Sequence, residues 1–176
     1  MKLSRISNQA LERVLSCNLW DLGNTIQSLF STIQDLGIKK GKHPKNRLNI
    51  RQEKKVLELS DKADALYLKL LKNIFDLESI WRELGAAIEA LECEVDGDLG
   101  IALQTARQLA AQLEGIIQND RALLGKVKYL IQEVIPLWQQ KGPSVDFLSF
   151  EMEEILALCD SNQRQRNKIN PLEVPK

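Results

Sequence analysis

The residues that carry metal and acid–base chemistry in helical proteins are scarce in this chain. Among its 176 residues there is one histidine, His43, and there are three cysteines, Cys17, Cys93 and Cys159. A di-iron helical bundle needs two Glu-x-x-His pairs, and a structural zinc site needs four cysteine or histidine ligands at short spacings. One histidine and three widely spaced cysteines complete neither set. We therefore expect no metal site and no cofactor.

Nucleophilic and phosphate-binding chemistry also lacks its usual sequence patterns. The chain contains no GxxxxGK[ST] or GxGxxG motif, and such loops need a preceding strand to position them. No spacing of serine, lysine or aspartate places a base beside a nucleophile. Glu89 and Glu92 lie one helical turn apart, as a pair of Mg²⁺ ligands would, but the facing segment offers only Glu114, Asp120 and Glu133, which are widely separated. The sequence therefore predicts a non-enzymatic protein with no catalytic residues.

The cysteines and the hydropathy pattern bear on location. An odd number of scattered cysteines is typical of reduced thiols in the cytoplasm rather than of a disulfide framework. The first residues form no apolar run of signal-peptide length, because Glu12 and Arg13 interrupt it. Nowhere do about 18 apolar residues follow one another, so no membrane span is expected. These features predict a cytoplasmic protein.

Apolar residues repeat with helical spacing from the start of the chain. No helix breaker occurs over residues 7–36, and Gly37 follows, as expected at a helix C-terminus. Residues 39–49 are rich in lysine, glycine, proline and asparagine, which predicts a loop. The steps of three and four that define this first helix join Leu15, Leu19, Leu22, Ile26, Leu29, Ile33 and Leu36.

Two longer segments, residues 50–91 and 99–140, keep a seven-residue apolar repeat. Each would be roughly 60 Å long as a helix, and the short polar stretch between them favours a tight reversal. Three apolar columns in every seven residues indicate helices that are buried against more than one neighbour. We therefore predict an antiparallel hairpin whose apolar columns face each other.

Two polar residues, Asn73 and Asp120, interrupt these columns and would fall opposite each other in the hairpin. A buried polar group is costly unless it is hydrogen-bonded, and a polar residue in a helical seam often fixes its register. We therefore predict a structural polar layer in which the two side chains share a hydrogen bond. The alternative is that the pair belongs to a functional site.

The rest of the chain completes an all-α fold. A fourth, shorter helix is expected over residues 144–160, and Pro136 should kink or loosen the end of the helix before it. Residues 161–176 are polar, which predicts a flexible C-terminal tail. We predict a single domain over residues 1–160, an elongated antiparallel bundle of about four helices, arranged up-down-up-down and built on the long two-helix hairpin.

Charge is balanced over the whole chain but not along it. The sequence has 24 basic and 24 acidic residues, yet residues 39–55 carry a local charge of +7 and residues 56–100 a local charge of −7. The two clusters should lie at opposite ends of the second helix, each as a candidate contact for a charged partner. The basic segment comprises Lys39, Lys40, Lys42, Lys45, Arg47, Arg51, Lys54 and Lys55. The acidic tip comprises Glu89, Glu92, Glu94, Asp96 and Asp98.

These features favour a non-catalytic protein–protein interaction subunit, an adaptor or scaffold that acts in a larger assembly as a homo- or hetero-oligomer. Trp20, Phe30 and Trp138 are candidate apolar contacts, although the simpler expectation is that they cover the fourth side of the bundle. The alternative function is that of an accessory subunit that binds nucleic-acid phosphates through the basic segment. Because no aromatic residue lies in that segment, such binding would not depend on base sequence.

Overall fold

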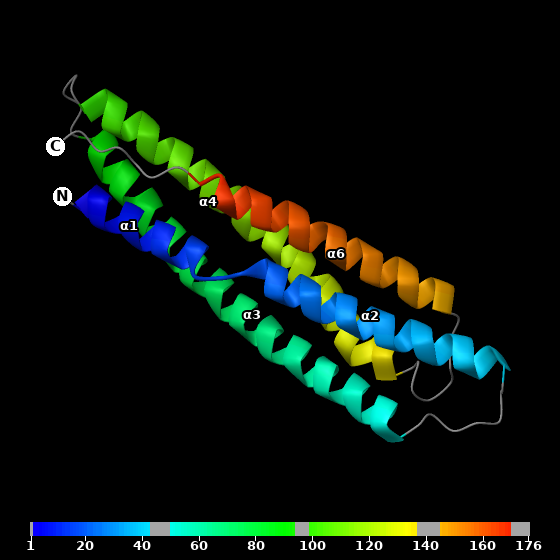
Figure 1. Ribbon diagram of the computed structural model, residues 1–176. Helices are drawn as coiled ribbons and strands as arrows, with labels where there is room; N and C mark the ends of the chain where they lie inside the picture. Colours follow the sequence, from blue (N-terminus) through cyan, green and yellow to red (C-terminus); the bar gives the residue numbers. More distant parts are fainter. Residues whose placement is uncertain (1, 43–49, 94–98, 137–144, 170–176) are drawn as a thin grey trace.

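The computed structural model of the chain describes residues 2–42, 50–93, 99–136 and 145–169. Over these ranges, no helix is long and apolar enough to cross a membrane. The helical elements, shown in Figure 1, are α1 (Lys2–Leu15), α2 (Leu19–Lys42), α3 (Ile50–Glu92), α4 (Leu99–Tyr129), the π-helical turn η1 (Leu130–Val134) and α6 (Val145–Asn167).

The helices form an elongated antiparallel bundle. α1 and α2 follow one another in the same direction, α3 runs back beside them, α4 returns, and α6 runs back again beside α2 (Figure 1). α3 packs most extensively on α4, and α6 packs on α2 and α4. The fold is therefore the predicted all-α, up-down-up-down bundle, in which α1 and α2 together take the place of the first helix.

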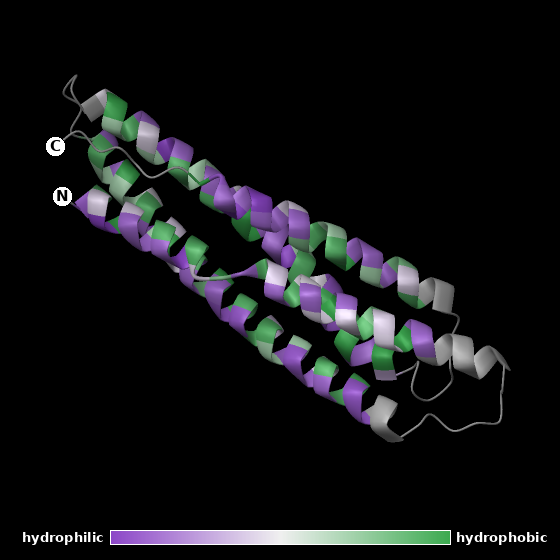
Figure 2. Ribbon diagram, viewed as in Figure 1, coloured by the Kyte–Doolittle hydropathy of each residue, from purple (hydrophilic) through white to green (hydrophobic). Residues whose placement is uncertain are grey.

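One apolar core runs along the bundle. Leu70, Leu77 and Leu84 from α3 and Leu109 and Leu123 from α4 are all at least 98% buried. These residues belong to the predicted seven-residue columns, and Figure 2 shows apolar and polar residues alternating along each helix with the period of a turn. Burial of these columns supplies the main free energy that holds the helices together.

Ion pairs show the direction in which α3 and α4 pack. Glu78 pairs with Arg121, and Glu92 pairs with Arg107. Glu92 lies two heptads after Glu78 on α3, whereas its partner Arg107 lies two heptads before Arg121 on α4. An antiparallel arrangement requires this reversal. The predicted hairpin is therefore confirmed.

The first predicted helix is wrong in one respect. The sequence predicts one helix over residues 7–36, but the structure has two, which are separated by residues 16–18. Neither proline nor glycine marks this break. Instead Asn18 caps the start of α2, because its Oδ1 accepts a hydrogen bond from the Trp20 backbone N–H at 2.9 Å. Ser16 ends α1 in a similar way, since its Oγ donates to the Arg13 carbonyl oxygen at 2.9 Å.

The ends of the other helices differ in smaller ways. α2 continues past Gly37 to Lys42, so the first residues of the predicted loop are helical. α4 passes into a π-helical turn that ends at Val134, two residues before Pro136, close to where the sequence predicts a loosened helix. α6 extends to Asn167, so residues 161–167 are helical rather than part of a flexible tail. Residues 170–176 lie outside the described part of the chain.

Candidate functional site

Five polar side chains meet in the middle of the bundle, beside the break between α1 and α2. None of them exposes more than 7% of its surface, and two expose none. Burial of polar and charged groups is costly unless their atoms find partners, so the hydrogen bonds decide what this cluster does. We call it the buried polar layer: Asn73 from α3, Asp120 from α4, and Asn162, Gln163 and Arg166 from α6.

Arg166 lies at the centre of the layer. Its Nε and Nη2 atoms donate to Oδ2 of Asp120 at 3.0 and 2.5 Å. Nη2 also donates to Oδ1 of Asn73 at 2.7 Å, and Nη1 donates to the backbone carbonyl oxygen of Val14 at 2.9 Å. One guanidinium therefore joins α1, α3, α4 and α6.

The predicted pair of Asn73 and Asp120 is part of this layer. Both side chains are buried and bind the same guanidinium, but no hydrogen bond among the described residues joins them directly. Arg166, which the sequence predicts to lie in a flexible tail, bridges the two side chains instead. The sequence carries only an indirect signal: a buried aspartate needs a cation, and no lysine or arginine occupies the apolar columns of either hairpin helix.

The carboxylate of Asp120 is out of reach of solvent and is stabilised by hydrogen bonds from neighbouring side chains. In addition to the two bonds from Arg166, its Oδ1 accepts a hydrogen bond from Nδ2 of Asn162 at 3.1 Å. Burial raises the pKa of Asp120 above its ordinary value, while the charge of Arg166 and the hydrogen bonds from Arg166 and Asn162 act in the opposite direction. Arg166 and Asn162 therefore offset part of the cost of burying the charged form of this carboxyl group.

The layer also holds both helix ends at the break. The last carbonyl groups of a helix and its first N–H groups have no partner within the helix. At the end of α1, Nδ2 of Asn73 donates to the Arg13 carbonyl oxygen at 2.7 Å, and Arg166 donates to that of Val14. At the start of α2, the Leu19 N–H donates to Oε1 of Gln163 at 2.7 Å. Side chains from α3 and α6 thus replace hydrogen bonds that a continuous helix would have made within itself.

The chemistry of the layer suits it to holding the fold. An arginine side chain keeps its charge and cannot act as a base, and the Asp120 carboxylate has no access to solvent. Within the described residues, no group of three or more histidine, cysteine, aspartate or glutamate side chains is placed to hold a metal ion. The layer therefore fixes the α1–α2 break and anchors the last turns of α6.

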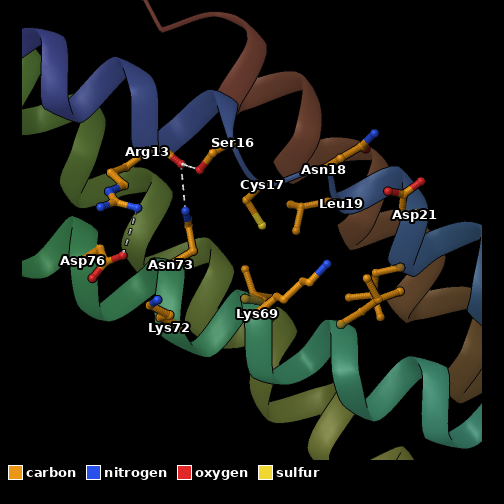
Figure 3. A pocket seen from close by; sticks show the side chains of 13 residues that line it. Arg13, Ser16, Cys17, Asn18, Leu19, Asp21, Lys69, Lys72, Asn73 and Asp76 are labelled. Atoms are coloured by element: carbon orange, nitrogen blue, oxygen red, sulfur yellow. Dashed lines mark hydrogen bonds and ion pairs between the residues drawn. The ribbon is translucent and has the colours of Figure 1, made fainter.

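A pocket of about 300 Å³ opens next to the layer (Figure 3). The break between α1 and α2 forms one wall and α3 forms the other. Lys69 and Lys72 of α3 and Asp21 of α2 line the pocket, and the Arg13–Asp76 ion pair joins its two walls. Cys17 also lines the pocket. Burial raises the pKa of its thiol, which disfavours the nucleophilic thiolate form. The pocket is a recess of mixed charge without an activated group.

The predicted basic segment lies at one end of the bundle, where α2 ends and α3 begins (Figure 1). Of its members whose side chains the structure describes, Lys54 and Lys55 are both exposed on the first turns of α3. The remaining members are Lys39, Lys40 and Lys42 at the end of α2, Arg51 at the start of α3, and Lys45 and Arg47, which lie outside the described residues.

The predicted acidic tip lies at the opposite end of α3 (Figure 1). Glu89 and Glu92 are exposed there, and Glu92 is partly neutralised because it pairs with Arg107 of α4. The other members of the tip, Glu94, Asp96 and Asp98, lie outside the described residues.

The three predicted apolar contacts have different environments. Phe30 is 9% exposed and belongs to the core, whereas Trp20 is 46% exposed. Trp138 lies outside the described residues. Phe30 therefore helps to cover the bundle, as the simpler of the two predictions for these residues states. Trp20 remains accessible at the start of α2.

A surface that the sequence analysis missed lies on the outer side of α3. Leu68 and Phe75 are one heptad apart and expose 54% and 61% of their surface. Counting in sevens, the procedure that found the core columns, would also have found this one. We call it the outer column; its members, all exposed, are Lys54, Asp61, Leu68, Phe75, Arg82 and Glu89.

Comparison of the chain with models of known protein families, with curated proteins and with solved structures finds no match. The function proposed below therefore rests on the residues and their geometry.

Proposed function

We propose that this protein is a non-catalytic protein–protein interaction subunit, an adaptor or scaffold that acts within a larger assembly. The observation that carries the proposal is the exposure of Leu68 and Phe75, one heptad apart on the outer side of α3. Leu57, which is 53% exposed, lies on the same side of the helix. Three large apolar side chains along one helical face form a surface that a partner could bury.

The energetic reason is the cost of leaving these side chains in water. Complete burial of a leucine or phenylalanine side chain contributes about 1.5–3 kcal/mol, and aromatic residues are enriched among those that dominate binding energies at interfaces. The bundle core is complete without Leu68 and Phe75, since the opposite side of α3 fills it with Leu70, Leu77 and Leu84. The outer apolar residues are thus free to contribute to an interface.

Site-specific photo-crosslinking tests the proposal. A benzophenone amino acid would replace Phe75 in cells that express the chain, and a second sample would carry it at Phe150, which is 58% exposed on α6 and serves as a matched control. We expect irradiation to produce a defined covalent adduct with a polypeptide from position 75 and not from position 150. An absence of any adduct from position 75 would contradict the proposal.

A second candidate function is the binding of nucleic-acid phosphates at the basic end of the bundle. The observation that favours it is that the lysine-rich end of α2 and the start of α3, where Lys54 and Lys55 are exposed, lie at the same end of the bundle (Figure 1). Lysines gathered at one end of a bundle would contact phosphates through charge rather than read bases. The salt dependence of oligonucleotide binding tests this candidate.

A further inference from the structure

The outer column of α3 has an order of residues that is complementary to itself. In steps of seven it reads Lys54, Asp61, Leu68, Phe75, Arg82, Glu89. About the midpoint between Leu68 and Phe75, each basic residue on one side mirrors an acidic residue on the other. A face with this order matches a second copy of itself when the copy runs in the opposite direction.

We propose that two copies of this chain associate through the outer columns of their α3 helices, which pack antiparallel about a two-fold axis between Leu68 and Phe75. The inference rests on the proposed interaction function and names the partner as the same chain. In this arrangement Leu68 lies opposite Phe75 of the partner subunit. Asp61 lies opposite Arg82 of the partner subunit, and Lys54 lies opposite Glu89 of the partner subunit. The two-fold axis repeats each contact, as in an isologous dimer.

Charge fixes the direction of the partner helix. A parallel arrangement in the same register would place each charged residue of the column opposite its own copy, so that all four charged positions would repel. Like charges at such positions destabilise a helical pair, whereas opposite charges select partner and orientation. The antiparallel arrangement replaces every one of these repulsions with an attraction.

The charges of the outer column are also available for a partner. On α3, four carboxylates pair with basic residues of other helices: Asp76 with Arg13, Glu78 with Arg121, Glu83 with Arg5, and Glu92 with Arg107. In contrast, Lys54, Asp61, Arg82 and Glu89 form no ion pair with any residue that the structure describes.

The residues beside the outer column permit close approach. Ala65, Ser79 and Ala86 are small, exposed and follow Asp61, Phe75 and Arg82 by four residues each, so they lie on the same face of the helix. The same antiparallel register places Leu57, the third exposed apolar residue, opposite Ala86 of the partner subunit. A column that repeats every seven residues also supports the left-handed supercoil in which paired helices stay in contact over many turns.

The experiment measures mass by sedimentation equilibrium over a range of protein concentrations at low salt. We expect the parent chain to reach twice the 20.0 kDa mass of one chain. Phe75→Glu should raise the dissociation constant of the dimer at least tenfold, and so should Asp61→Arg or Arg82→Asp alone. The controls are Phe150→Glu and Glu153→Arg, exposed positions on α6 that should leave the constant unchanged.

Mixing the single charge variants gives the sharpest test. Asp61→Arg and Arg82→Asp should each self-associate at least tenfold more weakly than the parent, but an equimolar mixture should form a heterodimer with close to the parent's affinity, because both ion pairs reappear between the two chains. In a parallel dimer each residue would face its own copy. Each single variant would therefore retain as many like-charge contacts as the parent, and its dissociation constant would not rise. A fold check by circular dichroism accompanies each variant, and no change is expected because the substituted side chains are exposed.

Several outcomes would overturn the inference. One is a parent chain that is monomeric at every concentration. Another is a dimer that tolerates Phe75→Glu, and a third is a pair of charge variants that fail to associate on mixing. If the parent is monomeric while crosslinking from position 75 captures a different protein, the self-association is wrong and the interaction function stands. If position 75 yields no adduct and the parent is monomeric, both are wrong.

Discussion

The guanidinium of Arg166 lies 2.5 Å from the carboxylate of Asp120, and neither side chain exposes any surface to solvent. The two residues are on α6 and α4, and the same guanidinium reaches Asn73 on α3 and the Val14 carbonyl group on α1. The last turns of α6 therefore cannot leave the bundle without stranding a buried carboxylate and freeing a helix end. This contact ties the C-terminal end of α6 to the stability of the whole fold.

Replacement of Arg166 should be among the most destabilising single changes in this protein. Arg166→Met leaves the Asp120 carboxylate buried without its cation, and removal of one partner from a buried ion pair costs about 3–5 kcal/mol. Urea denaturation followed by circular dichroism measures the loss. The matched control is Arg164→Met, because the Arg164 side chain is 69% exposed and, among the described residues, pairs only with Asp160 one turn away; we expect its midpoint to stay close to that of the parent.

A double variant separates the ion pair from simple packing. Asp120→Leu and Arg166→Met together remove both charged groups of the layer and leave the hydrogen bond from Asn73 to the Arg13 carbonyl oxygen in place, and apolar residues can replace a buried ion pair with little loss. The double variant should therefore be more stable than Arg166→Met alone. Equal or lower stability would show that the unpaired carboxylate is not the cause of the loss.

Asn18 should contribute to stability as the cap of α2. Its Oδ1 accepts the hydrogen bond from the Trp20 N–H, and Asn18→Ala should reduce the free energy of unfolding by about 1 kcal/mol. Asn24→Ala is the control, since Asn24 is exposed inside α2 and alanine is the better helix former there. Comparable losses in both variants would argue against the cap.

Gly23 should be needed for the close approach of α2 and α6. A Cβ atom at this position would lie 3.4 Å from Cβ of Cys159, so the longer side chain of Gly23→Leu would overpack the interface at a cost of about 1–3 kcal/mol. Gly125→Leu on α4 provides the contrast, because a Cβ there meets nothing within 4 Å and leucine favours the helix over glycine. Thermal unfolding of both variants would reveal the difference, and a stable Gly23→Leu protein would contradict this interpretation.

The three cysteines should react with iodoacetamide at different rates. Cys93 is exposed, Cys17 is intermediate and Cys159 is buried. Burial, followed by the charge of Asp120, raises the pKa of Cys159 to about 12, and the reactive form is the thiolate. Near neutral pH, we expect peptide mass spectrometry to show the order Cys93, then Cys17, then Cys159. In urea the rates should converge; rapid labelling of Cys159 in the folded protein would be evidence against its burial.

Nucleic-acid binding, if it occurs at the basic end, should be governed by salt. Affinity for a short oligonucleotide, measured by fluorescence anisotropy, should fall at least about tenfold between 50 and 200 mM salt. It should be lost when Lys39, Lys40, Lys42 and Lys45 become glutamine. Removing the same number of charges from Lys2, Lys62, Lys128 and Lys168, which are exposed elsewhere, should have a smaller effect. Equal retention by both variants would exclude this surface.

The sequence by itself determined the fold class and the long hairpin. The reason is that the apolar repeat of seven residues is a local property, and a helix can bury only the face on which that repeat places its leucines. Columns such as Leu70–Leu77–Leu84 therefore predict both the α3 helix and the side on which α4 must pack. Asn73 and Asp120 stand out for the same reason, since each interrupts a column.

Only the tertiary structure decided where the first helix breaks and what Asp120 binds. The break at residues 16–18 carries no proline or glycine. Its helix ends are satisfied by Asn73, Gln163 and Arg166, and the last two lie 144 and 152 residues away in the sequence from the groups that they bind. Arg166 sits in residues 161–168, a polar stretch that contains no apolar residue. Its burial becomes favourable only when four helices bring a carboxylate, an amide and a free carbonyl group to the same point, because a buried charge is tolerated only where all of its partners are present at once.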